Sequence, residues 1–172
     1  NYGTWENRKN TVQAGAASAD GGGYGAYVEF KAGETVQVKV ASSYISMEQA
    51  ELNLATELGA DKTLEQTKNN AAEVWNKALN KIQVEGGTEE DKATFYSCFF
   101  RASLFSRKFY EIDKDGKVYY FSPYDGKVHY GYMFTDTGFW DTFRAQFPLS
   151  TLLHPEMQGQ YMQAMIDAWH QC

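Results

Sequence analysis

Of all the stretches in this sequence, TDTGFWDTFR at residues 135–144 has the residue types and spacing best suited to binding or reacting with a ligand. It places two carboxylates, Asp136 and Asp141, near Trp140 and Arg144 around a predicted helix start. Carboxylate and guanidinium groups can each hold two neighbouring hydroxyl groups in one plane, and a ring can stack on a sugar. These residue types therefore suit a polar cluster that binds sugar hydroxyls.

The same stretch also suits a purely structural role. In that interpretation Asp136 caps the helix and Trp140 packs in the core. Asp141 and Arg144 are three positions apart, so they share a helix face and can form an ion pair. Residue types alone leave both interpretations open.

A second stretch, RKFY at residues 107–110, leads into an aromatic-rich loop that ends with YYFSPY at residues 119–124. It predicts either one wall of a sugar pocket, or a helix end with favourable cations followed by an aromatic-packed loop. The three histidines, at positions 129, 154 and 170, have no metal-ligand spacing, so no metal site is predicted in this chain. The glycines at 21–23 lack the strand–turn–helix setting of a phosphate-binding loop.

Composition narrows the classes of function. The chain has 172 residues, a length typical of one domain or of parts of two. Aromatic residues make up 16% of it, which suits sugar stacking as well as core packing. The net charge is −6 and the basic residues are scattered, which argues against nucleic-acid binding. No apolar run reaches the length of a membrane-spanning helix. The chain has only two cysteines, too few for a disulfide framework.

The first third of the chain has the alternation of β-strands. Residues 24–30, YGAYVEF, and residues 35–40, TVQVKV, both alternate between apolar and polar positions, with a short glycine-containing turn between them. Two such runs predict an antiparallel hairpin. The small and glycine-rich residues 14–23 predict a loop.

The rest of the chain is mainly helical in pattern. Ser46 and Gln49 have the spacing of a capping box, and residues 61–82 carry apolar side chains near 3.6 spacing. Thr88 and the acids after it open a third helix, which is predicted to run to about Lys108 with most of its sides buried.

After that helix the pattern changes twice. Turns at residues 113–116 and 123–126 flank a predicted strand at 118–121. Two last helices are predicted, one near residues 137–153 and one from Pro155 to the end of the chain. The last helix has no stop signal, so the sequence is interpreted as a fragment.

Four stretches together resemble glycoside hydrolase family 92. They are VKVASSYISMEQAELNL at 38–54, WNKALNKIQVEGGT at 75–88, residues 95–110 with SPYDG at 122–126, and residues 132–153, which contain TDTGFWDTFRAQFPLSTLL. The resemblance covers nearly the whole chain from about Tyr24, with the motifs in the family's order.

The resemblance implies an α+β fragment. Family members have an N-terminal β-sandwich and a C-terminal (α/α)6 barrel, with the active site between them. Residues 1–45 are then expected to be the last strands of the sandwich, residues 46–87 a helical linker, and residues 88–172 the start of the truncated barrel.

The resemblance also implies an activity. The full-length protein is expected to be a bacterial, calcium-dependent, inverting exo-α-mannosidase that removes terminal α-linked mannose, with α-1,2 linkage favoured, from mannans or N-glycans. Its catalytic acid, catalytic base and calcium ligands are expected after Cys172, so no catalytic or metal-binding residue is assigned in this chain. Its partners are a mannose-containing glycan and the remainder of its own polypeptide, in the periplasm or outside the cell.

By this resemblance, the motif at residues 135–144 is the part of the family's sugar-binding site that this chain contains. Asp141, Arg144 and Asp136 are predicted to contact the terminal mannose, and Trp140 either stacks on the sugar or packs behind them. Two alternatives stay open: a non-catalytic carbohydrate-binding protein of the same descent, and another (α/α)6 glycosidase. If residues 1–172 alone hydrolysed substrate, Asp136, Asp141 and Glu111 would be the first residues to mutate.

Overall fold

A computed structural model describes residues 1–135 and 138–172 of the chain. The chain forms two compact units, Asn1–Val38 and Lys39–Cys172. Each unit is described by itself. The chain contains both strands and helices, as predicted for an α+β fragment.

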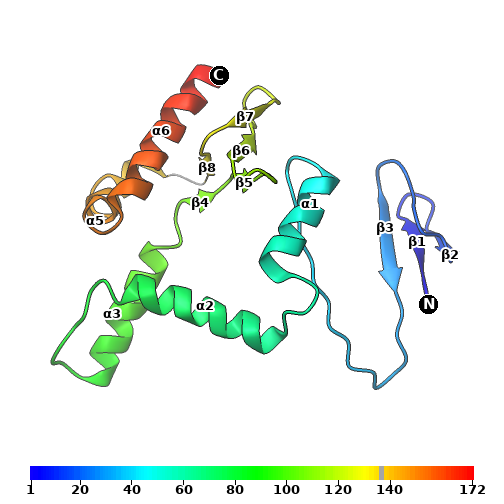
Figure 1. The fold of residues 1–172 in the computed structure, drawn as a ribbon, viewed down its shortest axis with the longest axis horizontal. Helices are drawn as coiled ribbons and strands as arrows, with labels where there is room; N and C mark the ends of the chain where they lie inside the picture. The colour runs from blue at the N-terminus through cyan, green and yellow to red at the C-terminus, as the bar shows by residue number, and fades with distance from the viewer. Residues whose placement is uncertain (136–137) are drawn as a thin grey trace. The chain divides into compact units, whose positions relative to one another are not determined.

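The first unit is a three-stranded antiparallel sheet in the order β2–β1–β3 (Figure 1). Its strands are β1 (Tyr2–Glu6), β2 (Thr11–Ala14) and β3 (Tyr24–Val28). Gly25 of β3 lies opposite Trp5 of β1, and a Cβ atom at this glycine would overlap the indole ring. Glycine therefore allows the tryptophan to lie flat across the neighbouring strand.

The predicted hairpin of residues 24–30 with 35–40 is wrong in its pairing. Strand β3 forms, but it pairs with β1, and the structure has no strand at residues 35–40. Val38 and Val40 are 72% and 77% exposed, because no described strand covers the face that their alternation would bury. The β1–β2 hairpin was missed because its turn contains no glycine; Asn10 adopts the left-handed conformation instead, with φ of 51°.

The second unit contains the helical elements. These are α1 (Met47–Asn53), the π-helix η1 (Leu54–Leu58), α2 (Leu64–Leu79), α3 (Glu89–Ala102), α4 (Phe139–Thr142), α5 (Gln146–Leu153) and α6 (Pro155–Gln171). Thr88 and Asp91 form a reciprocal capping box at the start of α3, and Pro155 occupies the first turn of α6. The predicted starts of these two helices are confirmed. Among the described helices, none is both long and apolar enough to cross a membrane.

One predicted helix ends earlier than expected, and another is interrupted. The third helix was predicted to reach Lys108, but α3 ends at Ala102, and residues 107–108 form strand β4, which pairs with β8 (Phe134–Thr135). The helix predicted at 137–153 is divided into α4 and α5. Gln146, at the start of α5, donates hydrogen bonds to the carbonyls of Ala102 and Phe105 at 3.1 and 2.6 Å, which ties α5 to the end of α3.

A second three-stranded sheet, β5–β6–β7, lies beside α6. Its strands are β5 (Glu111–Ile112), β6 (Val118–Phe121) and β7 (Val128–Tyr130), and the turns between them lie where the sequence predicts them. Tyr120, 1% exposed, accepts a hydrogen bond from Gln171 of α6 at 2.6 Å. The core therefore lies between this sheet and α6, around Tyr120, Met133 and Tyr161.

The prediction that the third helix is buried on most sides is wrong for this chain. Phe99 is 7% exposed, but Phe100 is 36% exposed and Phe105, just past the end of α3, is 57% exposed. Phe100 is covered in part by the ring of Trp75 from α2, with ring centroids 4.4 Å apart. The two helices thus meet along one face only.

Candidate functional site

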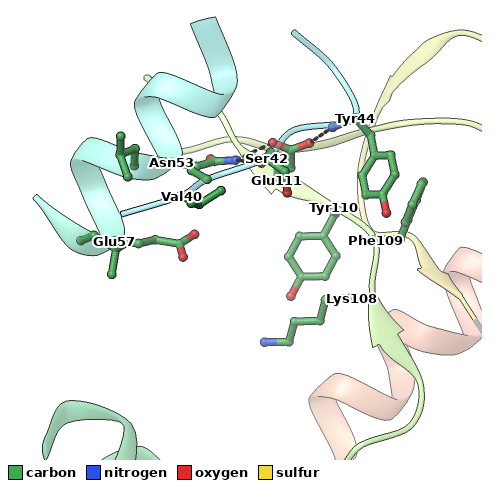
Figure 2. Close-up of a pocket in the computed structure, with 12 residues that line it drawn as sticks. Val40, Ser42, Tyr44, Asn53, Glu57, Lys108, Phe109, Tyr110 and Glu111 are labelled. Atoms are coloured by element: carbon green, nitrogen blue, oxygen red, sulfur yellow. Dashed lines mark hydrogen bonds between the residues drawn. The ribbon is translucent and has the colours of Figure 1, made fainter. Parts of the chain in front are cut away.

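A pocket of about 350 Å³ opens in the second unit between residues 40–44, the α1–η1 segment and residues 108–111 (Figure 2). Its lining combines charged, polar and aromatic side chains. The side chains of this kind are Ser42, Tyr44, Asn53, Glu57, Lys108, Phe109, Tyr110 and Glu111. Ligand pockets generally combine apolar and aromatic walls with a few polar groups that orient the ligand, and this lining contains both kinds of side chain.

Glu111 is the best-anchored acid of this pocket. One of its carboxylate oxygens accepts hydrogen bonds from the Ser43 hydroxyl and the Tyr44 backbone N–H, both at 2.9 Å. The other accepts from the Asn53 side-chain amide at 2.7 Å. The carboxylate thus joins β5 to the extended segment before α1 and to the end of α1 itself, and we infer that its role is to fix these three segments.

Gln49 continues this polar network into the interior. It is 4% exposed, and its amide donates to the Asn53 side chain and to the Ile112 carbonyl, both at 2.8 Å. Its carbonyl accepts from the Tyr119 hydroxyl at 2.6 Å. Burial raises the pKa of Tyr119 above its ordinary value, and the charge of Glu111 adds to this, so the phenol stays a donor.

The capping box predicted at Ser46 is therefore only half present. The Ser46 hydroxyl accepts from the Gln49 backbone N–H at 3.1 Å, as an N-cap does. The Gln49 side chain does not return to the cap, because it is used in the buried network instead. A complete capping box forms at Thr63 and Gln66, a start that was not among those predicted from the sequence.

The wall formed by residues 108–110 is held in place by neighbouring strands. Lys108 lies opposite Phe134 in the β4–β8 ladder, and the Phe109 N–H donates to the Met133 carbonyl at 2.8 Å. The Tyr110 ring packs edge-on against Tyr132 and Phe134, with centroids 5.0 and 5.7 Å apart. Strand pairing and ring packing together make this wall rigid. The segment was predicted as either a helix end or a pocket wall; it is not helical, and it lines this pocket.

Two oppositely charged side chains face the open part of the pocket. Glu57 comes from η1 and Lys108 from β4, and Figure 2 shows both reaching towards the space between these segments. The Lys108 ammonium lies 5.9 Å from the centre of the Tyr110 ring. Within residues 1–135 and 138–172, neither charged group has a hydrogen bond or an ion pair.

The residues predicted to contact sugar lie elsewhere in the unit. Trp140 and Asp141 are on α4, while Arg144 follows the end of that helix. Trp140 is 69% exposed, so it does not pack in a core in this chain, and the Arg144 guanidinium lies over its ring at 4.6 Å. None of the three lines the pocket of Figure 2, and Asp136 lies outside the described residues.

The ion pair considered for Asp141 and Arg144 is not formed between these two described side chains. Helix α4 ends at Thr142, so the two residues do not share a continuous helix face. Arg144 stacks on Trp140 instead, a contact that leaves the Asp141 carboxylate exposed. Both charged groups are therefore accessible to a ligand.

Comparison with known proteins gives two kinds of similarity. The model of the glycosyl hydrolase family 92 catalytic domain matches residues 49–172. The solved structure of the family GH92 inverting mannosidase BT2199 from Bacteroides thetaiotaomicron VPI-5482 is 42% identical, with a TM-score of 0.83 over 99% of this chain and 23% of that chain.

A second solved structure, the gh92 family glycosyl hydrolase ccman5, is 20% identical, with a TM-score of 0.76 over 97% of this chain and 22% of that one, which shows similarity of fold. No curated protein matches. The chain thus spans less than a quarter of the length of the solved structures that it resembles.

Proposed function

This chain belongs to glycosyl hydrolase family 92, and we propose that the complete protein is an inverting exo-α-mannosidase, to which the chain contributes scaffold and part of the sugar pocket. The observation that carries the proposal is the 42% identity, over 99% of the chain, to a protein described as an inverting mannosidase. Residues 1–45, 46–87 and 88–172 are proposed as the end of the sandwich, the linker and the start of the barrel.

Within this chain, Asp141 and Arg144 are proposed to bind hydroxyl groups of the terminal mannose, together with Asp136. Their support is that Asp141 and Arg144 are exposed and are not paired with each other. An unpaired carboxylate accepts from two hydroxyls, and a guanidinium donates to hydroxyl oxygens. Trp140 orients Arg144 through the ring contact at 4.6 Å.

No catalytic residue is assigned among the described residues. Inversion requires a general acid at the leaving oxygen and a general base that activates water on the opposite face of the sugar, with carboxyl groups about 6.5–9.5 Å apart. We propose that these carboxylates belong to the part of the complete protein that this chain does not contain.

Calcium is proposed for the complete protein only. Among residues 1–135 and 138–172, no three His, Cys, Asp or Glu side chains gather as a metal ion would require. No calcium ligand is therefore assigned among these residues, and no step at this chain is attributed to the ion.

The preferred linkage and the setting are further parts of the proposal. The α-1,2 linkage and a mannan or N-glycan substrate are proposed from the family resemblance. A bacterial source is proposed with support from the bacterial relative, and a periplasmic or extracellular location is proposed from the polymeric nature of such substrates.

The experiment is an assay of the complete protein on α-1,2-, α-1,3- and α-1,6-linked mannobiose, with and without a calcium chelator. We expect release of mannose, fastest from the α-1,2 disaccharide, and loss of activity in chelator that added calcium restores. Residues 1–172 alone should be inactive. Binding without any release would instead support a non-catalytic carbohydrate-binding protein, and release of another sugar would support a different glycosidase.

A further inference from the structure

The pocket of Figure 2 has a feature that the proposed contacts at α4 do not use. Its open side carries one carboxylate and one ammonium, Glu57 and Lys108, neither of which has a hydrogen-bonding partner within the described residues. The other acid of the pocket, Glu111, is already fixed by three donors. Among the described residues of this pocket, Glu57 and Lys108 are therefore the charged groups whose hydrogen-bonding capacity is unused.

The backbone positions of these two groups and the Tyr110 ring are fixed by the surrounding structure. Lys108 lies on the β4–β8 ladder, and the neighbouring Tyr110 ring is held by two edge-on aromatic contacts. Glu57 lies on η1, a five-residue π-helix closed by the hydrogen bond from the Gly59 N–H to the Leu54 carbonyl at 3.0 Å. Short π-helical segments are rare and occur frequently at functional sites. Binding of a ligand would therefore order mainly the two side chains, Glu57 and Lys108, and not the backbone that carries them.

The chemistry of the lining indicates a neutral polyhydroxyl ligand. Two carboxylates and one ammonium give the lining a net negative charge, which disfavours phosphate or sulfate groups. A carboxylate accepts hydrogen bonds from hydroxyl groups, and an ammonium donates to hydroxyl oxygens. The Tyr110 ring adds an aromatic surface, and about 350 Å³ lies near the lower end of ligand pockets, which suits a single sugar unit.

We propose that this pocket binds one mannose unit of the glycan, with Glu57 and Lys108 as its hydrogen-bonding groups and Tyr110 as its aromatic surface. The proposal rests on the proposed function, since it takes the ligand class from the activity of the complete protein. It adds a sugar-binding site whose residues do not include Asp141 or Arg144.

The test uses the complete protein and an S-linked α-mannotriose, which cannot be hydrolysed. Its dissociation constant is measured by calorimetry for Glu57→Gln and Lys108→Met, with Glu73→Gln and Lys114→Met as matched controls on exposed positions that do not line the pocket. Each pocket variant should weaken binding about tenfold, the effect of losing one hydrogen bond, and the controls should not. Melting temperatures should stay within about 1 °C because both side chains are exposed.

The outcomes separate this proposal from the proposed function. If wild-type protein releases mannose but both pocket variants bind the thio-trisaccharide as tightly as wild type, the sugar site is refuted and the activity stands. If wild-type protein releases no mannose but binds the trisaccharide, and the variants weaken that binding, the site stands and the activity is refuted. Absence of trisaccharide binding by the wild-type protein refutes the site.

Discussion

Replacement of Glu111 by alanine should loosen the segment before α1. The side chain accepts three hydrogen bonds, from the Ser43 hydroxyl, the Tyr44 N–H and the Asn53 amide, at distances of 2.7 to 2.9 Å. Alanine leaves all three donors without their partner, while the backbone of β5 stays unchanged. The expected result is local opening around Tyr44, with the remainder of the fold retained.

The magnitude follows from the exposure of these groups. A hydrogen bond to a charged group contributes about 1.5–3 kcal/mol when water is excluded. Tyr44 is 68% exposed, so water replaces part of what its N–H loses, and the lower end of this range applies. A loss of about 1.5 kcal/mol in the free energy of local opening corresponds to about tenfold faster amide exchange.

Hydrogen-exchange mass spectrometry of the complete protein measures this directly, in peptides that cover residues 43–46. Glu111→Ala should accelerate exchange of the Tyr44 amide about tenfold, and Glu111→Gln should have a smaller effect because one carbonyl oxygen remains. Glu57→Gln, in the same pocket but without a protein partner among the described residues, is the control and should change nothing. Unchanged exchange at Tyr44 in Glu111→Ala would refute the anchoring role.

Three further predictions concern other parts of the chain. Asp141→Asn should lower kcat/KM of the complete enzyme about 30-fold, because a charged hydrogen bond to substrate contributes about 2 kcal/mol, while the melting temperature stays unchanged. Thr88→Ala should lower the free energy of unfolding by about 1 kcal/mol, measured by denaturant unfolding, because it removes the α3 capping box with Asp91. Burial, and to a smaller extent the charge of Lys81, lower the pKa of His154 below 6.5. The contribution of the neutral imidazole to the free energy of unfolding is therefore fully present above pH 6.5, and it is lost as the pH falls through the folded-state pKa. An NMR titration of the imidazole measures this pKa, which should rise in Lys81→Met.

Each of these predictions has a control and a contradicting result. Asp61→Asn, an exposed acid outside the motif, should leave kcat/KM unchanged, and an equal kcat/KM for the Asp141 variant would rule out its contact with substrate. Thr67→Ala removes a hydroxyl inside α2 that is not a cap, and it should cost less than the Thr88 variant does. Lys68→Met, which removes a lysine of α2 that pairs with Glu65, should leave the titration of His154 unchanged. A measured pKa of 6.5 or above for His154 would contradict the effects of burial and charge.

The starts of α1, α3 and α6 could be predicted from the sequence because they depend on neighbouring residues. The caps at Ser46 and Thr88 and the proline at 155 lie where their local signals indicate. The end of α3 could not be predicted, because it depends on a distant partner. Residues 107–108 leave the helical pattern to pair with residues 134–135, and no periodicity within 88–108 encodes that pairing.

The candidate site was predictable only in part for the same reason. The motif at 135–144 is contiguous, so the sequence is enough to propose Asp141 and Arg144 as ligand-binding residues, which stays a prediction. The break after Thr142 that separates them could not be predicted. The pocket of Figure 2 combines residues 40–44, 53–58 and 108–111, which are far apart in the sequence. The residue types of Glu57 and Glu111 do not distinguish them from other acids until the fold brings their partners together.

The central claim is tested most directly by following the first product of the complete protein on α-1,2-linked mannobiose by proton NMR. An inverting exo-α-mannosidase releases β-mannose first, and the α-anomer then appears slowly by mutarotation. Release of α-mannose as the first product, or of no mannose in the presence of calcium, would contradict the account.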